Sequence, residues 1–376
     1  MKKIKILHCG DLHFDTPFTE LSRVEAEKRK EDLRETFGQI IDLVKKENVP
    51  ILLISGDLFD NTKVMKMTLD YIISKFNEIP ETRIFISPGN HDPYTQRSFY
   101  SIMDWPLNVH IFDTAIGKVK IPEQNVCVYG IGFSKSHEKQ CLIEKFSAED
   151  DNCINIMVLH GEVVSLGQNS DYHPIPLEHI ENSKLDYLAL GHRHTYEGIQ
   201  KTGSTFWSYS GNPEGRGFDE LGSKGVVLGE IGKGYCALNF LPINKREYVV
   251  KKVDISGVST YEEVVQAIFR DITDAAQQDN LYKIILTGKV SSEFTIQRQV
   301  LEEKIKKNFY FVKIQDATQM EIDYDRLENE FSLKGLFVKK MRKKIHGAAT
   351  ELEKKQLFHA LEIGIKALED EEVPIE

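Results

Sequence analysis

The chain has 376 residues, 41% of them hydrophobic and 28% charged, which is the composition of a soluble globular protein with room for two domains. Its formal net charge of −10 excludes a global attraction to nucleic acid but leaves a local basic groove open. The sequence has no apolar run near the ~18 residues of a membrane span, and its start is too polar for a secretory signal. Five scattered cysteines without a C-x-x-C pair indicate reduced thiols, so we expect a cytoplasmic protein that does not contact a membrane.

Strands and helices alternate in the first quarter of the chain. Apolar runs at 4–9, 51–55 and 83–87 predict strands, and a 3.6-residue period predicts a helix to about residue 47 and another near 65–76. Strand–helix–strand order is typical of a parallel sheet with helices on its faces. More strand-like runs follow, up to about residue 231, so we expect an α/β domain over 1–245.

The character of the sequence changes near residue 245. Shorter strand and helix patterns predict a small α+β domain at 246–325, and two amphipathic patterns predict a C-terminal helical segment at 326–376. The segment 211–225 contains five glycines and mixed charge, so we expect a mobile surface loop there.

Residues that can bind metal ions follow five of the predicted strands. In a parallel sheet, ligands bind beyond the carboxyl ends of the strands. Carboxylate, imidazole and amide oxygen are the donors preferred by Mn²⁺, Zn²⁺ or Fe²⁺. Seven ligands are too many for one ion and suit two ions that share a carboxylate. We assign Asp11, His13 and His194 to one ion, Asn90, His160 and His192 to the other, and Asp57 to both.

Two metal ions at such a site favour phosphoryl chemistry, because they stabilise both the attacking and the leaving oxygen. We expect His91 to lie over the scissile phosphate as proton donor or charge stabiliser, with the carboxylate of Asp60 holding its far nitrogen. The amide of Asn90 can bind a metal ion through oxygen and a phosphate through nitrogen. Arg193 and Arg216 are further candidate phosphate contacts.

The order D-x-H, G-D-x-x-D, G-N-H-D, a lone H and G-H-x-H resembles the calcineurin-like metallophosphoesterase superfamily over roughly residues 1–240. Within it, DLHFDTPF, GDLFDN, SPGNHD and GNPEGRGF are similar to the SbcD-type DNA repair exonucleases, in their YhaO-like bacterial branch. This resemblance implies a four-layer α/β sandwich core, a small capping domain and C-terminal helices that bind an SMC-like ATPase. Archaeal and eukaryotic relatives carry His where this chain has Asp60. Because phosphoprotein phosphatases also have Asp there, that residue does not discriminate between substrates.

Three functions are compatible with these patterns. The first is the Mn²⁺-dependent DNA exonuclease subunit of an SbcCD-like complex, with an SbcC-type ATPase as partner and a homodimer also open. Since the sequence has no G-x-x-x-x-G-K-[ST], ATP hydrolysis would come from the partner. The second is a small-molecule phosphodiesterase or phosphatase, although Asn61 stands where phosphoprotein phosphatases have Arg. The third, a non-catalytic scaffold, is least favoured because every metal position carries a ligand.

Overall fold

The structure is a computed structural model that describes residues 2–149, 152–165, 167–270, 272, 274–291 and 294–368. The chain divides into two compact units, which we describe separately. The first comprises Met1–Lys251, Ile272–Lys283 and Ile305–Lys313, and the second comprises Lys252–Asp271, Ile284–Lys304 and Ile314–Glu376. The domain boundaries at 245 and 325 stay a prediction.

Six strands form the first sheet, in the order β14-β13-β1-β2-β3-β4. Strands β1 to β4 run parallel to their neighbours, as the strand–helix alternation predicts, whereas β13 pairs antiparallel with β1. The strands are β1 (Lys3–Cys9), β2 (Ile51–Ile54), β3 (Arg83–Ile86), β4 (Val109–Ile111), β13 (Gly225–Gly232) and β14 (Tyr235–Pro242).

A second six-stranded sheet has the order β11-β12-β10-β7-β6-β5. Its four central strands are parallel and its two edge strands antiparallel. The strands are β5 (Gly117–Ile121), β6 (Val126–Ile131), β7 (Ile154–His160), β10 (Tyr187–Gly191), β11 (Gln200–Thr202) and β12 (Thr205–Tyr209).

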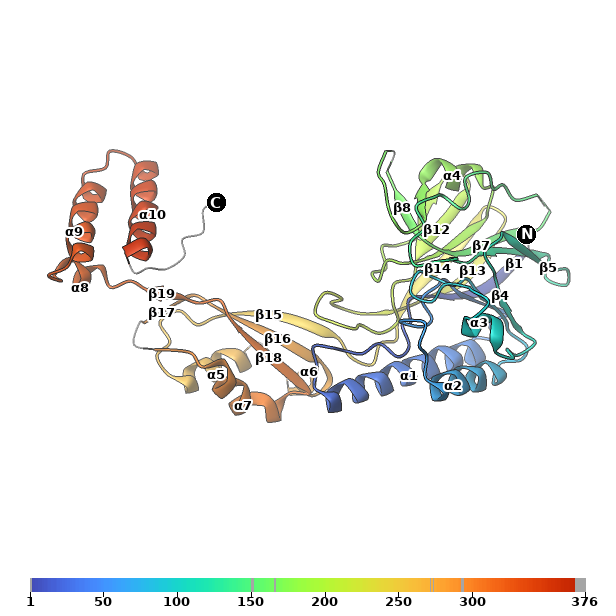
Figure 1. Ribbon diagram of the computed structural model, residues 1–376, viewed down its shortest axis with the longest axis horizontal. Helices are drawn as coiled ribbons and strands as arrows, with labels where there is room; N and C mark the ends of the chain where they lie inside the picture. Colours follow the sequence, from blue (N-terminus) through green and yellow to red (C-terminus); the bar gives the residue numbers. More distant parts are fainter. Residues whose placement is uncertain are drawn as a thin grey trace. The chain divides into compact units, whose positions relative to one another are not determined.

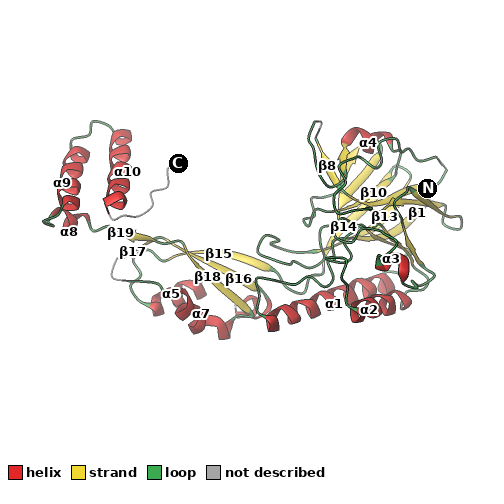
Figure 2. Cartoon of the chain, viewed as in Figure 1, coloured by secondary structure: helices red, strands yellow, loops and turns green. Residues whose placement is uncertain are grey.

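The two sheets and the helices form four layers. Alternate residues of a strand point to opposite faces, so Ile6 of β1 packs in the core between the sheets while Leu7 packs against helices α1 (Arg23–Lys46) and α2 (Lys66–Asn77). The second sheet packs its other face against α4 (Leu177–Asn182). The helices α1 and α2 lie side by side along the first sheet (Figure 2). The predicted four-layer α/β core is confirmed.

The other elements are short or follow residue 245. Three strands form a sheet in the order β15-β16-β18, and two-stranded sheets pair β17 with β19 and β8 with β9. These elements are α3 (Phe99–Ile102), β8 (Glu162–Val164), β9 (Pro174–Pro176), β15 (Tyr248–Asp254), α5 (Tyr261–Arg270), α6 (Asp274–Asp279), β16 (Leu281–Thr287), β17 (Lys289–Ser291), α7 (Arg298–Ile305), the 3-10 helix η1 (Lys306–Asn308), β18 (Phe311–Asp316), β19 (Gln319–Glu321) and α8 (Tyr324–Glu328).

The chain's last described helices, α9 (Leu333–His346) and α10 (Glu351–Leu368), lie side by side (Figure 1). Their shared core includes Leu361 and Ile365 of α10, whereas Phe358 of the same helix is 44% exposed. None of the helices described here is long and apolar enough to cross a membrane.

Candidate metal centre

Four of the predicted ligands follow their strands with unusual backbone conformations. Asp11, His13, Asp57 and His192 have φ angles of 52°, 50°, 48° and 103°. Residues other than glycine rarely adopt positive φ, and such strain concentrates at functional sites. Main-chain hydrogen bonds hold the β1 and β2 turns together, since Asp11 N–H donates to the Gly56 carbonyl at 3.0 Å and His13 N–H to the Asp57 carbonyl at 2.9 Å.

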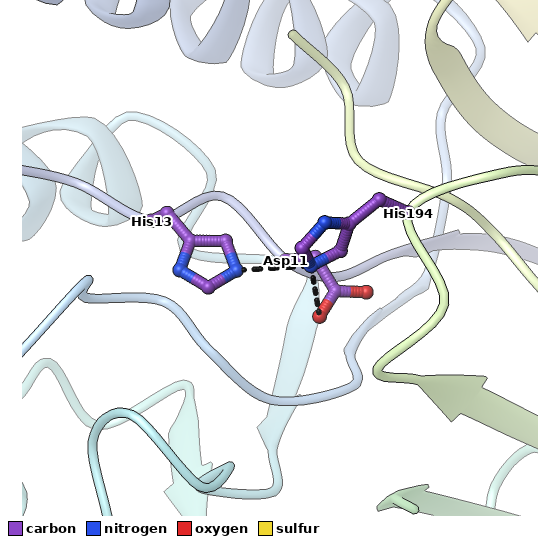
Figure 3. A group of neighbouring side chains, drawn as sticks. All are labelled: Asp11, His13 and His194. Carbon is purple, nitrogen blue, oxygen red and sulfur yellow. Dashed lines mark hydrogen bonds and ion pairs between the residues drawn. The ribbon is translucent and has the colours of Figure 1, made fainter. Parts of the chain in front are cut away.

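The first group of metal-binding atoms comes from Asp11, His13 and His194, whose donor atoms lie within 4.8 Å of one another (Figure 3). The Nε2 atoms of His13 and His194 face each other at 3.3 Å. The Nε2 atom of His194 is also 3.9 Å from Asp11 Oδ1. Two imidazole nitrogens and a carboxylate that converge in this way are suitable ligands for a divalent metal ion.

A second group joins Asp11, Asp57 and His160. His160 Nε2 lies 3.4 Å from Asp57 Oδ2 and 2.9 Å from the amide oxygen of Asn90. The same Asp57 oxygen is 3.6 Å from His13 Nε2. Asp57 therefore lies between the two groups, where a carboxylate that bridges two ions would have to be.

His192 lies beside the second group, with its ring centroid 5.3 Å from that of His160. The donor groups found among the described residues do not include it. Its main-chain N–H donates to both carboxylate oxygens of Asp11, at 3.1 and 3.0 Å. His192 thus orients a ligand of both groups through its backbone.

Two glycines allow the turns to approach the ligands closely. A Cβ atom on Gly89 would lie 2.1 Å from Asp57 Oδ1, and one on Gly56 would lie 2.3 Å from His160 Nδ1. Gly56 also has a φ of +89°, which side chains rarely tolerate. These glycines explain why the G-D and G-N-H-D motifs need a residue without a side chain.

Burial sets the electrostatics of the ligands. It raises the pKa of Asp11 to about 7 and that of Asp57 to about 6, and it lowers the pKa of His160 to about 3 and that of His13 well below its usual value. The imidazoles of His13 and His160 are therefore neutral, as metal ligands must be. The pKa of His194 is raised instead, because Glu220 and Asp11 outweigh the lowering effect of burial. Buried carboxylates with raised pKa values lack a compensating cation, which bound metal ions would supply. The donor set thus fits divalent metal ions.

His91 lies at the mouth of this cluster with an exposed side chain. Its main-chain N–H donates to Asp57 Oδ1 at 3.0 Å, and its Nδ1 is 2.9 Å from the main-chain carbonyl oxygen of Asp60. The carboxylate of Asp60 instead lies 3.2 Å from His13 Nδ1 and 3.1 Å from Arg216 Nη1. Asp60 therefore holds His91 through its backbone, and its carboxylate has other partners.

The two arginines proposed to contact phosphate differ in their surroundings. Arg193 is partly exposed, and its guanidinium lies 3.1 Å from Glu197 and 3.6 Å from Glu162. Arg216 is mostly buried against Asp60 and Glu220. Only Arg193 therefore presents its charge at the surface.

No role was predicted from the sequence for two buried carboxylates near the site, Asp92 of the G-N-H-D motif and Glu220. Asp92 accepts hydrogen bonds from Gly89 N–H at 2.8 Å and from the Tyr100 hydroxyl at 2.6 Å, which braces the G-N-H-D turn. Glu220 lies 2.7 Å from His194 Nδ1. It belongs to the glycine-rich segment, and the prediction of a surface loop there is wrong for 211–215 and Glu220, which are buried.

Comparison with known proteins identifies the family. The sequence model of the calcineurin-like phosphoesterase family matches residues 4–196. The uncharacterized metallophosphoesterase YhaO of Bacillus subtilis is 23% identical over 356 residues, covering 89% of this chain and 86% of that protein. The DNA double-strand break repair protein Mre11 of Saccharolobus solfataricus is 24% identical over 335 residues, covering 84% of each. Because the matched region contains every ligand of both donor groups, the chain belongs to the calcineurin-like phosphoesterase family and is a metal-dependent hydrolase.

Proposed function

We propose that the protein is a phosphodiesterase with two Mn²⁺ ions and acts as the DNA exonuclease subunit of an SbcCD-like complex. The observation that carries the dinuclear site is the position of Asp57 Oδ2, 3.6 Å from His13 and 3.4 Å from His160. Choosing DNA as the substrate draws on the similarity to Mre11 over 84% of the chain. Zn²⁺ or Fe²⁺ would suit the same donors.

The protein's own residues would hold two ions and position the phosphate between them. Asp11, His13 and His194 would bind one ion, and Asn90, His160 and His192 the other, with Asp57 shared. When bound, two divalent ions lower the pKa of water and neutralise the charge that develops on a phosphodiester. The chain then needs no nucleophile of its own.

His91 would donate the proton to the leaving oxygen. Since the carbonyl oxygen of Asp60 only accepts hydrogen bonds, Nδ1 of His91 carries a proton and is fixed at 2.9 Å from that oxygen. Nε2 is then the atom available to exchange a proton with the substrate. The exposed ring lies next to the ligands, 4.8 Å from the ring of His13, where a phosphate bound to the ions would be in reach.

Substrate and partner contacts extend this proposal. The amide nitrogen of Asn90 and the guanidinium of Arg193 are candidate phosphate contacts, whereas the guanidinium of Arg216 is engaged by Asp60 and Glu220. The segment containing α9 and α10 would dock an SMC-like, SbcC-type ATPase in the cytoplasm through its exposed apolar side chains. Those more than a third exposed are Phe331, Leu333, Leu336, Leu352, Phe358, Ile363 and Leu368. We keep a homodimer as part of the proposal.

The experiment compares the wild type with Asp57→Ala in Mn²⁺ on labelled double- and single-stranded DNA, bis-p-nitrophenyl phosphate and p-nitrophenyl phosphate. We expect DNA to be degraded from its ends by the wild type and not by the variant. Cleavage of the model diester or the monoester without any DNA degradation would favour the small-molecule enzyme. A protein that binds Mn²⁺ but cleaves none of the four would be a scaffold.

A further inference from the structure

Glu220 is a buried carboxylate whose two oxygens are fully engaged beside the first donor group. Its Oε1 lies 2.7 Å from His194 Nδ1 and accepts from Arg216 Nη2 at 2.8 Å and Nε at 3.1 Å. Its Oε2 accepts from Asn212 Nδ2 at 2.6 Å and from Arg216 N–H at 2.9 Å. Glu220 is 6% exposed. These hydrogen bonds fix the carboxylate in a single orientation, with Oε1 directed at His194 Nδ1.

The contact with Glu220 decides which nitrogen of His194 carries the proton. A carboxylate can only accept, so the proton of the neutral ring lies on Nδ1, 2.7 Å from Glu220, although Arg216 Nη2 also lies 3.1 Å from that nitrogen. In this tautomer Nε2 keeps its lone pair. That Nε2 atom is the one that faces His13 Nε2 at 3.3 Å and Asp11 Oδ1 at 3.9 Å (Figure 3). Histidines that bind metal ions commonly have their other nitrogen held by a carboxylate in this way.

Arg216 connects this carboxylate to the turn after β2. While Nε and Nη2 bind Glu220, Nη1 lies 3.1 Å from Asp60 Oδ1. The same oxygen of Asp60 is 3.2 Å from His13 Nδ1. The guanidinium thus joins the two acids that lie behind the two histidines of the first donor group, and all three of its nitrogens are engaged.

The loop that carries these residues is attached to α1. Glu214 is buried and accepts from Arg29 Nη2 at 2.6 Å, from the Thr36 hydroxyl at 2.8 Å and from Lys245 N–H at 2.7 Å. Arg29 is itself fully buried and also donates to the Gly215 carbonyl at 2.9 Å. These bonds fix the loop whose other end places Glu220 on His194.

We propose that Glu220 and Arg216 are positioning residues for one metal ion. Glu220 selects the His194 tautomer that can bind the ion, and Arg216 aligns His194 with His13 through Asp60. The ion they serve is the one assigned to Asp11, His13 and His194, so this inference rests on that part of the proposed function. Arg216 then acts on ligands and does not contact the substrate phosphate.

Mn²⁺ binding to the full-length protein tests the role of Glu220. Metal-free wild type, Glu220→Gln and the control Glu230→Gln are titrated with Mn²⁺ by calorimetry, and bound metal is counted by mass spectrometry. Glu230 suits the control because its half-exposed side chain pairs only loosely with Lys3, at 3.8 Å. We expect Glu220→Gln to weaken one of the two sites by about 10- to 100-fold and to spare the other. Two sites of wild-type affinity, or equal loss of both in a folded variant, would overturn the proposal.

The wild-type protein offers a test that needs no Glu220 variant to fold. Long-range ¹⁵N–¹H spectra of the metal-free protein show which ring nitrogen of each histidine carries the proton, and the signal missing from His194→Gln identifies His194. We expect an Nδ1–H tautomer at a pH at which the His194 ring is neutral. A neutral Nε2–H ring would remove the role of Glu220.

Arg216→Gln separates positioning from substrate contact. We expect weaker binding of the same single Mn²⁺ ion as in Glu220→Gln. Wild-type affinity at both sites, combined with a raised KM for bis-p-nitrophenyl phosphate, would make Arg216 a phosphate contact and refute this part. These readouts are independent of the proposed activity, because a wild type that binds two Mn²⁺ ions without degrading DNA would refute only the nuclease.

Discussion

Replacing His91 with Ala should abolish most turnover while both metal ions stay bound. The imidazole is exposed, and its contact with the cluster through hydrogen bonds is limited to Nδ1 on the Asp60 carbonyl oxygen, at 2.9 Å, among the residues described. The bond to the ligand Asp57 comes from the main-chain N–H of His91 at 3.0 Å, which Ala retains. The substitution therefore removes the proton donor and leaves the support of Asp57 intact.

The size of the effect follows from the role. A positioned general acid contributes typically about 10²–10⁴-fold, or roughly 3–5 kcal/mol of barrier at about 1.4 kcal/mol per tenfold change. We expect kcat for DNA to fall by that factor. KM should change little, because the metal ions would still bind the phosphate. Leaving groups that need no proton should lose less, so kcat for DNA should fall further than kcat for the p-nitrophenyl ester.

The assay pairs steady-state kinetics with the Mn²⁺ content of each variant. His346→Ala is the matched control, since its ring is also exposed and also lies on a main-chain carbonyl oxygen, that of Arg342 at 2.8 Å. A loss of Mn²⁺ in proportion to the loss of turnover would show that His91 holds metal. A loss of less than tenfold on DNA would remove it from the chemistry altogether.

Three other changes test the close packing, the docking segment and the acid response. Gly89→Ala puts a Cβ 2.1 Å from Asp57 Oδ1. We expect the free energy of unfolding to fall by on the order of 1–3 kcal/mol and the Mn²⁺ content to fall as well. In the control Gly38→Ala the new Cβ lies 3.5 Å from its nearest neighbour, so neither quantity should change. Leu352→Glu, at a side chain 69% exposed, should abolish co-purification with an SMC-like ATPase and leave diester cleavage unchanged; retained binding would refute docking through this residue. Burial lowers the pKa of His8 to about 3, so the folded state binds fewer protons than the unfolded state. The corresponding stability, on the order of a few kcal/mol, is complete above pH 6.5 and is lost as the pH falls toward 3. The free energy of unfolding, measured in urea, should therefore depend less on pH in His8→Gln than in the wild type between pH 3 and 6.5. An unchanged pH dependence would contradict this.

The clustering of the candidate ligands at the strand ends could be predicted because their placement depends on local rules. An apolar run that stops at Gly-Asp or Gly-His places its polar residue at the carboxyl edge, and parallel order then gathers these edges. Strand β2 and the Asp57 turn illustrate this, since the four residues of β2 are all buried and the turn follows at once. Periodicity and strand order carry that information along the sequence.

Contacts between distant side chains could not be predicted in the same way. Glu220 lies 26 residues after His194, at the end of a loop that sequence composition marks as flexible, and its burial depends on Arg29 in another layer binding Glu214. The start of helix α5 likewise depends on local side-chain hydrogen bonds. The capping pair of α5 is Thr260 with Glu263, joined by hydrogen bonds of 3.3 and 3.1 Å.

The packing of one sheet on the other determines whether the two donor groups share ligands. Ser55, directly after β2, has a carbonyl oxygen that lies 3.0 Å from His160 Nδ1 at the end of β7, which leaves His160 Nε2 directed toward Asp57. A Cβ on Gly191, at the end of β10, would lie 1.8 Å from that same carbonyl oxygen. The ends of β2, β7 and β10 therefore meet at the Ser55 carbonyl group, and position 191 has no room for a side chain beside it. Because the first sheet supplies Asp11 and Asp57 and the second supplies His160 and His194, this contact brings the two halves of the candidate metal centre together.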